Sequence, residues 1–195
     1  MSIEASNLWL PIDGGITAPV GFKAGGINAG LKGSHSNKPD LAILLAPKES
    51  ACAGIFTQSL ARAACVDLSI ERLRATSGRI RAVLINSGQA NACTGDLGLV
   101  DSLRATKALA DRLALQAEEV LICSTGVIGV PIPMQLLLAG LDPLIERMSN
   151  EGGMAASNAI LTTDLVQKQI AFEADLGGRR VRIGGMAKGS GMIHP

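Results

Sequence analysis

The residues with the clearest chemical potential lie in the stretch STGVIG, at residues 124–129. Thr125 carries a hydroxyl donor, and Gly126 offers a backbone N–H that no side chain obstructs. Two converging donors of this kind are what the oxyanion of a tetrahedral intermediate requires. A simpler alternative is that Ser124 and Thr125 only cap a turn through local hydrogen bonds. The residues by themselves leave both interpretations open.

Other polar residues that could bind or react also have simple structural explanations. The TTD stretch at residues 162–164 is equally typical of a helix end, and Lys188 is equally typical of an exposed lysine. The two histidines, His35 and His194, have no matching Asp motif, and the Gly-x-Ser-x-Gly turn of serine hydrolases is absent. The sequence therefore argues against a Ser-His-Asp triad, and both histidines are expected in solvated loops.

Two glycine clusters superficially resemble phosphate-binding loops. The first, GGINAG, lacks the Gly-x-Gly-x-x-Gly order and follows no predicted strand. The second, GGMAKGSG, places its lysine before the glycine and serine, which is the wrong order for a P-loop. We therefore expect no nucleotide cofactor.

The four cysteines are widely spaced and include no Cys-x-x-Cys pair. This spacing argues against a metal site and against a disulfide framework. We expect all four to be reduced residues of the core: Cys52, Cys65, Cys93 and Cys123.

The composition narrows the class of protein. The chain has 195 residues, 18 Lys plus Arg against 17 Asp plus Glu, and only 2% aromatic residues, so nucleic acid is not an expected partner. The longest apolar runs are too short for a membrane span, and the first residues lack the features of a secretion signal, so a cytoplasmic protein is expected. Residues 1–195 are predicted to form one domain. With 18% charged residues and a mean hydropathy of +0.31, the chain is either well buried or presents an apolar surface to a partner.

Several elements must position these residues. The glycine-rich stretch at residues 14–33 predicts a loop. The stretch NSGQANACTG predicts a sharp turn that walls a site. Short aliphatic runs predict strands at residues 41–45, 51–57, 64–68, 81–85 and 120–123.

The second half of the chain shows helical spacing. Six residues recur at steps of four and three, which predicts one helix face: Leu99, Leu103, Thr106, Ala110, Leu113 and Ala117. Asp101 is expected largely off that face. Further helices are predicted at residues 134–148 and 153–160, and a hairpin is predicted from residues 167–174 and 179–183 around Gly177-Gly178.

Five motifs together resemble one family. They are GITAPVGFKAGGINAGLK, NSGQANACTG, STGVIG, TTD and GGMAKGSGMIHP, and they occur in the order and approximate spacing of the glutamate N-acetyltransferases, also called ornithine acetyltransferases. The resemblance covers nearly the whole chain, with Gln89 where the family more often has Asn. It implies an α/β fold with mixed β-sheets packed between helical layers, shared with self-processing aminopeptidases.

The resemblance also implies a self-cleaved enzyme of arginine biosynthesis. Acetyl would pass from N2-acetylornithine to glutamate through an acetyl-threonine, without a cofactor, and acetyl-CoA is a second candidate donor. The threonine would begin a β chain just beyond the sequence matched by residues 191–195, and the two chains would assemble as α2β2. Thr125 and Gly126 match the oxyanion hole, whereas Thr162 and Lys188 match substrate-binding positions.

Two alternatives stay open beside this interpretation. One is a self-processed aminopeptidase of the same fold, in which water accepts the acyl group. The other is a non-catalytic subunit whose glycine loops bind a small ligand. An apolar face covered by a β chain would explain the low charge of this chain, and His194 would adjoin the expected site.

Overall fold

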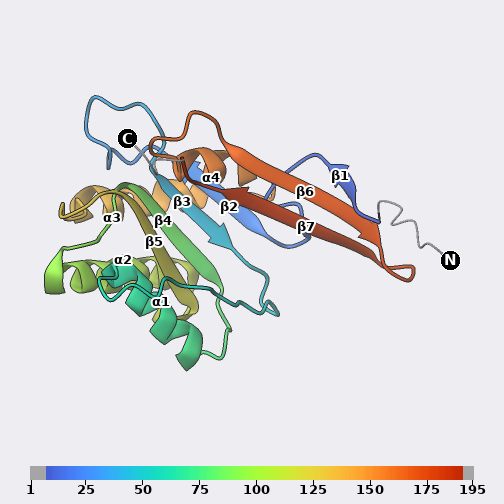
Figure 1. Cartoon of the computed structure of the whole chain (residues 1–195), viewed down its shortest axis with the longest axis horizontal. Helices are drawn as coiled ribbons and strands as arrows, with labels where there is room; N and C mark the ends of the chain where they lie inside the picture. Colours follow the sequence, from blue (N-terminus) through green and yellow to red (C-terminus); the bar gives the residue numbers. More distant parts are fainter. Residues whose placement is uncertain (1–7, 191–195) are drawn as a thin grey trace.

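The computed structural model describes residues 8–190 and contains two β-sheets (Figure 1). The larger sheet has the strand order β2-β3-β4-β5. The first two pairs are antiparallel and β4–β5 is parallel, so this sheet is mixed as expected. Its strands are β2 (Lys23–Ile27), β3 (Leu41–Leu45), β4 (Ala82–Gln89) and β5 (Val120–Val127).

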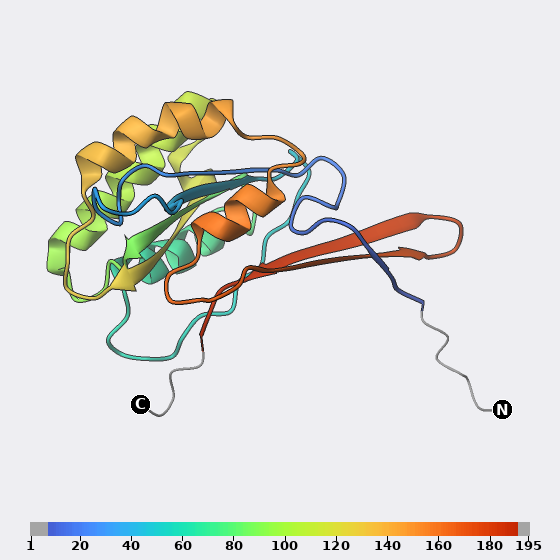
Figure 2. The same cartoon turned by 90° about the horizontal axis from the view of Figure 1, so that it is seen from above.

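Helices cover both faces of this sheet (Figure 2). Because side chains alternate along a strand, Leu41 and Ile43 of β3 pack into the main core on one face, whereas Ala42 packs with α4 (Gly153–Ala159) on the other. The main core lies beneath the other three helices. They are α1 (Ala64–Ala75), α2 (Gly95–Leu113) and α3 (Met134–Glu146), with the short 3-10 helix η1 (Ala117–Glu119) leading into β5.

A strand lies inside the segment that was predicted to be a loop. Residues 14–33 include β2, which pairs with β3 along its whole length. The glycines serve packing here, because a Cβ on Gly26 would overlap the Ala155 carbonyl of α4. The prediction failed because the composition typical of a flexible turn also suits a strand on which a helix packs directly.

The smaller sheet is antiparallel, with the order β1-β6-β7. It consists of β1 (Leu10–Ile12), β6 (Lys168–Asp175) and β7 (Arg180–Ala187). β6 and β7 form the predicted hairpin and project away from the larger sheet (Figures 1 and 2). Within β6 only Ala171 and Ala174 are buried, so this sheet buries little apolar surface.

Two predicted strands before β4 are wrong. Residues 51–57 have no regular structure, and residues 64–68 form the first turns of α1. The buried residues of α1 show helical spacing that a five-residue window does not reveal: Cys65, Leu68, Ser69 and Arg72.

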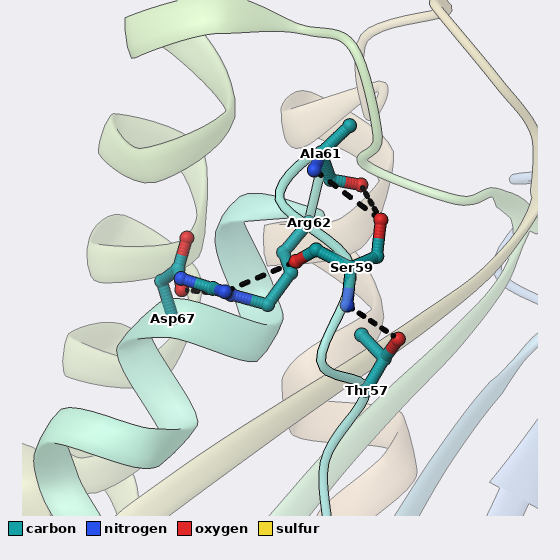
Figure 3. Close-up of polar contacts among 5 residues, drawn as sticks. All are labelled: Thr57, Ser59, Ala61, Arg62 and Asp67. Carbon is teal, nitrogen blue, oxygen red and sulfur yellow. Dashed lines mark hydrogen bonds and ion pairs between the residues drawn. The ribbon is translucent and has the colours of Figure 1, made fainter.

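Polar contacts tie the irregular segment to the start of α1 (Figure 3). Arg62 Nε pairs with Asp67 at 2.7 Å, and Arg62 Nη1 donates to the Ser59 carbonyl at 3.0 Å. The Ser59 N–H donates to Thr57 Oγ1 at 3.2 Å. These contacts replace the sheet hydrogen bonds that a strand would have made.

The helix α2 forms over most of the predicted stretch and ends at Leu113, but burial follows the predicted face only in part. Leu99 and Leu103 of that face are exposed and Thr106 of that face is buried, as are Asp101 and Ser102, which lie off it. Ser102 and Thr106 satisfy their hydroxyls on helix carbonyls one turn earlier, which makes their burial tolerable. Within residues 8–190 no helix is long and apolar enough to cross a membrane.

Candidate functional site

Thr125 and Gly126 lie near the end of the parallel ladder between β4 and β5. β5 does not end at residue 123 as predicted but continues to Val127, with Thr125 opposite Ser87 and Gly126 opposite Gly88. Ser124 and Thr125 therefore do not cap a turn, and that alternative is wrong. Thr125 is half-buried and Gly126 is exposed, so both are accessible to a ligand.

The close approach of the two strands requires glycine at position 126. Gly126 has φ +131°, and a Cβ there would overlap the backbone of Gly88. An L side chain at this site would be strained both by the dihedral angle and by the neighbouring strand. The backbone of Gly126 is thus presented bare beside the Thr125 side chain, as an oxyanion site needs.

The loop after β2 packs against the end of β4. Gln89 Nε2 donates to the Leu31 carbonyl at 2.7 Å, and the Leu31 carbonyl and Lys32 side chain lie against Gly88. β4 includes the first residues of NSGQANACTG, which were predicted to turn, and the chain leaves the strand only after Gln89. Gly88 of this stretch lies directly against Gly126, so we call the stretch the wall beside Gly126.

Lys32 links this wall to the TTD stretch. Its Nζ donates to the Pro39 carbonyl at 2.7 Å and to the Leu161 carbonyl at 2.8 Å, directly before Thr162. Desolvation lowers the pKa of Lys32, the Asp40 carboxylate opposes that shift, and the nearby charges of Lys38 and Lys188 add to it. The Lys32 side chain therefore lies beside Gly88 of β4, and its ammonium group is near Lys188.

A second link runs through α4. Ser87 Oγ, on the residue opposite Thr125, donates to the Ala159 carbonyl at 2.6 Å. Three residues later, the Thr162 N–H donates to Asp164 Oδ2 at 3.4 Å, and Asp164 Oδ1 accepts from the Gly189 N–H at 2.7 Å. Thr162 is thereby joined to the residue that follows Lys188.

The four residues singled out from the sequence are thus linked through hydrogen bonds and short stretches of backbone between them. The links pass through Lys32 and Asp164, two residues that the sequence did not single out for a role. Lys32 lies in a quoted motif and Asp164 ends another, but their contacts to distant carbonyls and amides have no local signal. His35 is exposed as expected, and His194 lies outside the described residues.

Cysteine chemistry and metal binding find little support in this region. Residues 8–190 hold no group of three His, Cys, Asp or Glu that would bind a metal, and all four cysteines are free. Cys65 is buried, but Cys93 and Cys123 are exposed, so the expectation of four core cysteines is wrong. Although Cys123 is exposed as a whole residue, desolvation of its thiol, with Cys65 and Cys52 nearby, raises its pKa to about 11. Its thiol is therefore protonated at neutral pH and is a poor nucleophile.

Two solved structures resemble this fold closely. Ornithine acetyltransferase from Mycobacterium tuberculosis, solved in complex with ornithine, is 41% identical, with a TM-score of 0.87, over 96% of this chain and 98% of that chain. The arginine biosynthesis bifunctional protein argJ from Bacillus halodurans is 36% identical, also with a TM-score of 0.87, over 96% of each chain. The chain thus has the α/β fold of the ornithine acetyltransferases, which confirms the expected fold class.

The sequence comparisons agree. A family model described as the ArgJ family matches residues 23–195. The arginine biosynthesis bifunctional protein ArgJ of Prochlorococcus marinus (strain MIT 9313) is 69% identical over 100% of this chain, and that of Parasynechococcus marenigrum (strain WH8102) is 70% identical over 96%. The chain belongs to the ArgJ family. It spans 45% of each of these relatives, or about half their length.

Proposed function

We propose that this chain is the α chain of a glutamate N-acetyltransferase that moves acetyl from N2-acetylornithine to glutamate in arginine biosynthesis. The observation that supports this most directly is the set of hydrogen bonds and short backbone stretches that links Thr125 and Gly126 to Thr162 and Lys188. These residues match the family positions for an oxyanion hole and for substrate binding. The likeness to a solved ornithine acetyltransferase complexed with ornithine favours the same substrate class.

In the proposed reaction, the hydroxyl of a threonine at the start of a β chain attacks the acetyl carbonyl. The threonine's own amino group takes the hydroxyl proton and returns it to the leaving amine of ornithine. Thr125 Oγ1 and the Gly126 N–H donate to the oxyanion while the tetrahedral intermediate exists. The amino group of glutamate then attacks the acetyl-threonine, and the threonine is regenerated.

Charge around the site suits substrates that carry a carboxylate. Lys188 is exposed at the end of β7, and Lys32 lies close enough for its pKa to be affected by Lys188. Two ammonium groups in this region attract the α-carboxylate of N2-acetylornithine and of glutamate. Acetyl-CoA remains a second candidate donor, and the transfer itself needs no cofactor.

The β chain is proposed to be a second polypeptide from the same precursor, assembled as α2β2 in the cytoplasm. The chain spans 45% of the curated relatives but matches 98% of a solved chain, so a polypeptide of about this length exists separately in that relative. β5 is an edge strand, and several large apolar side chains are exposed in the loops. They include Ile55, Leu60, Ile128, Leu165 and Val166. Covering them would remove a large apolar surface from water.

The test is to express the chain together with the remaining half of its precursor and to supply N2-acetylornithine. Intact-mass analysis should show an acetyl group on the second polypeptide, and added glutamate should remove that group as N-acetylglutamate. If water alone removes the acetyl group, the protein is an aminopeptidase-type hydrolase. If no second polypeptide and no adduct appear, the small-ligand-binding subunit is the better interpretation.

A further inference from the structure

An ion pair between a buried carboxylate, Asp164, and the partly exposed Lys168 holds the backbone next to Lys188. Asp164 has a fully buried side chain whose Oδ1 accepts from Lys168 Nζ at 2.6 Å and from the Gly189 N–H at 2.7 Å. Lys168 Nζ also donates to the Gly189 carbonyl at 2.7 Å. Both peptide groups of Gly189 are therefore bound by side chains. We call Asp164 and Lys168 the Gly189 clamp.

The clamp acts where the β-ladder stops. Lys168, the first residue of β6, is opposite Ala187, the last residue of β7. Beyond Ala187 the ladder makes no further pairing, so Lys188 and Gly189 would otherwise have no β-strand partner. Gly189 has φ +153°, a backbone conformation that L side chains rarely adopt. The side chains of the clamp hold the Gly189 N–H and carbonyl in place of the missing ladder bonds.

Hydrogen bonds hold the Asp164 carboxylate in its ionised form. The hydrogen bond from Lys168, followed by the one from the Gly189 N–H, holds the pKa of Asp164 well below its usual range. The carboxylate is therefore ionised at neutral pH, and bonds to it are charge-assisted. The same carboxylate also accepts from the Thr162 N–H. One ionised group thus accepts hydrogen bonds from the backbone of both Thr162 and Gly189, the residue after Lys188.

We infer that Asp164 and Lys168 are positioning residues for substrate binding and for self-cleavage. They act through Lys188, whose ammonium reaches the substrate carboxylate only if the Gly189 backbone is held, and through the anchored backbone from which the chain leads toward the proposed cleavage point beyond residue 195. This inference rests on the proposed function, because Lys188 has its substrate role only there. The hydrogen bonds of the clamp can be tested without measuring enzyme activity.

The first measurement is hydrogen exchange of the Gly189 amide in the co-expressed two-chain protein. Asp164→Asn and Lys168→Met should each speed exchange at Gly189 about tenfold or more, because each weakens a charge-assisted bond. Two matched controls should leave it unchanged. Asp111→Asn breaks an exposed i,i+4 pair with Lys107, and Asp175→Asn weakens the acceptor of the Gly178 N–H at the far end of the same hairpin. Unchanged exchange in the clamp variants would overturn the clamp.

The second measurement separates positioning from general stability. In Asp164→Asn and Lys168→Met the KM for N2-acetylornithine should rise about tenfold while kcat changes much less, and precursor cleavage should slow. Lys168→Arg should keep the KM and the rate of precursor cleavage close to those of the unsubstituted protein, since it keeps a cation at this position. A KM and a cleavage rate that match the unsubstituted protein, despite faster exchange at Gly189, would refute the positioning role. If the unsubstituted protein itself neither cleaves nor transfers acetyl, the proposed function fails, and the exchange experiment still decides the clamp.

Discussion

The two sheets of this chain are built very differently. The four-stranded sheet is covered by helices on both faces, and residues such as Leu84 are fully buried within it. The β1-β6-β7 sheet leaves large side chains such as Ile170 and Ile183 about half exposed. The proposed oxyanion residues lie in the first sheet, whereas Thr162 and Lys188 flank the hairpin of the second. The proposed oxyanion residues thus belong to the well-packed sheet, whereas the proposed substrate-binding residues lie next to the strands of the more exposed sheet.

The largest expected effect tests the difference in packing. Leu84→Ala should lower the free energy of unfolding by about 2–5 kcal/mol, because it leaves a cavity in a closed core. Ile183→Ala, at a side chain that is 52% exposed, should change it by about 0.5 kcal/mol or less. Denaturant titration of the two variants measures both values. Equal losses would show that the β1-β6-β7 sheet is covered in solution, for example by the β chain.

The next effect concerns the proposed oxyanion residue Thr125 in the four-stranded sheet. Thr125→Ala should reduce kcat for acetyl transfer by about 100-fold or more, with little change in KM, because an oxyanion donor acts mainly in the transition state. Steady-state kinetics of the two-chain enzyme measures the split. A rise in KM at constant kcat would instead place Thr125 among the substrate-binding residues.

A smaller effect is the pH dependence of the contribution that Asp164 makes to the free energy of unfolding. The folded-state pKa of Asp164 lies below its unfolded value of about 4, so its contribution to stability is fully present above that pH. As pH falls below about 4, the unfolded state binds the proton first and the contribution is progressively lost. Unfolding titrations between neutral and acidic pH should show a steeper loss in the unsubstituted chain than in Asp164→Asn. Parallel curves would contradict the assigned shift.

The smallest effect comes from a pair with the same sequence spacing as the clamp. Lys107 and Asp111 pair at 2.6 Å on α2, but both side chains are more than half exposed. Asp111→Asn should change the free energy of unfolding by about 0.5 kcal/mol or less, since water and salt screen such a pair. Thermal unfolding at low and high salt checks this. A larger loss would mean that α2 is buried in the assembled enzyme.

Much of the fold was predictable where local pattern and burial agree. β3, the start of β4, α3, α4 and the β6–β7 hairpin are close to their predicted positions, because their periodicity and flanking glycines or prolines are local signals. β2 and the start of α1 were missed for the opposite reason. In β2, glycine serves contact with α4, and in α1 the helical period extends beyond the five residues that suggested a strand.

The residues of the proposed site likewise fall into those that the motifs indicated and those whose contacts only the fold shows. The residue types and order of the five motifs predicted the family, and they suggested the proposed oxyanion pair and the proposed substrate-binding residues, because those features lie in contiguous stretches. Only the tertiary structure decided that Lys32 bridges two of those stretches and that Asp164 and Lys168 hold Gly189. Such contacts join residues 21 to 129 positions apart, and they form only after the chain has folded. A sequence records the donors and acceptors, but their pairing at long range depends on how the folded backbone brings them together.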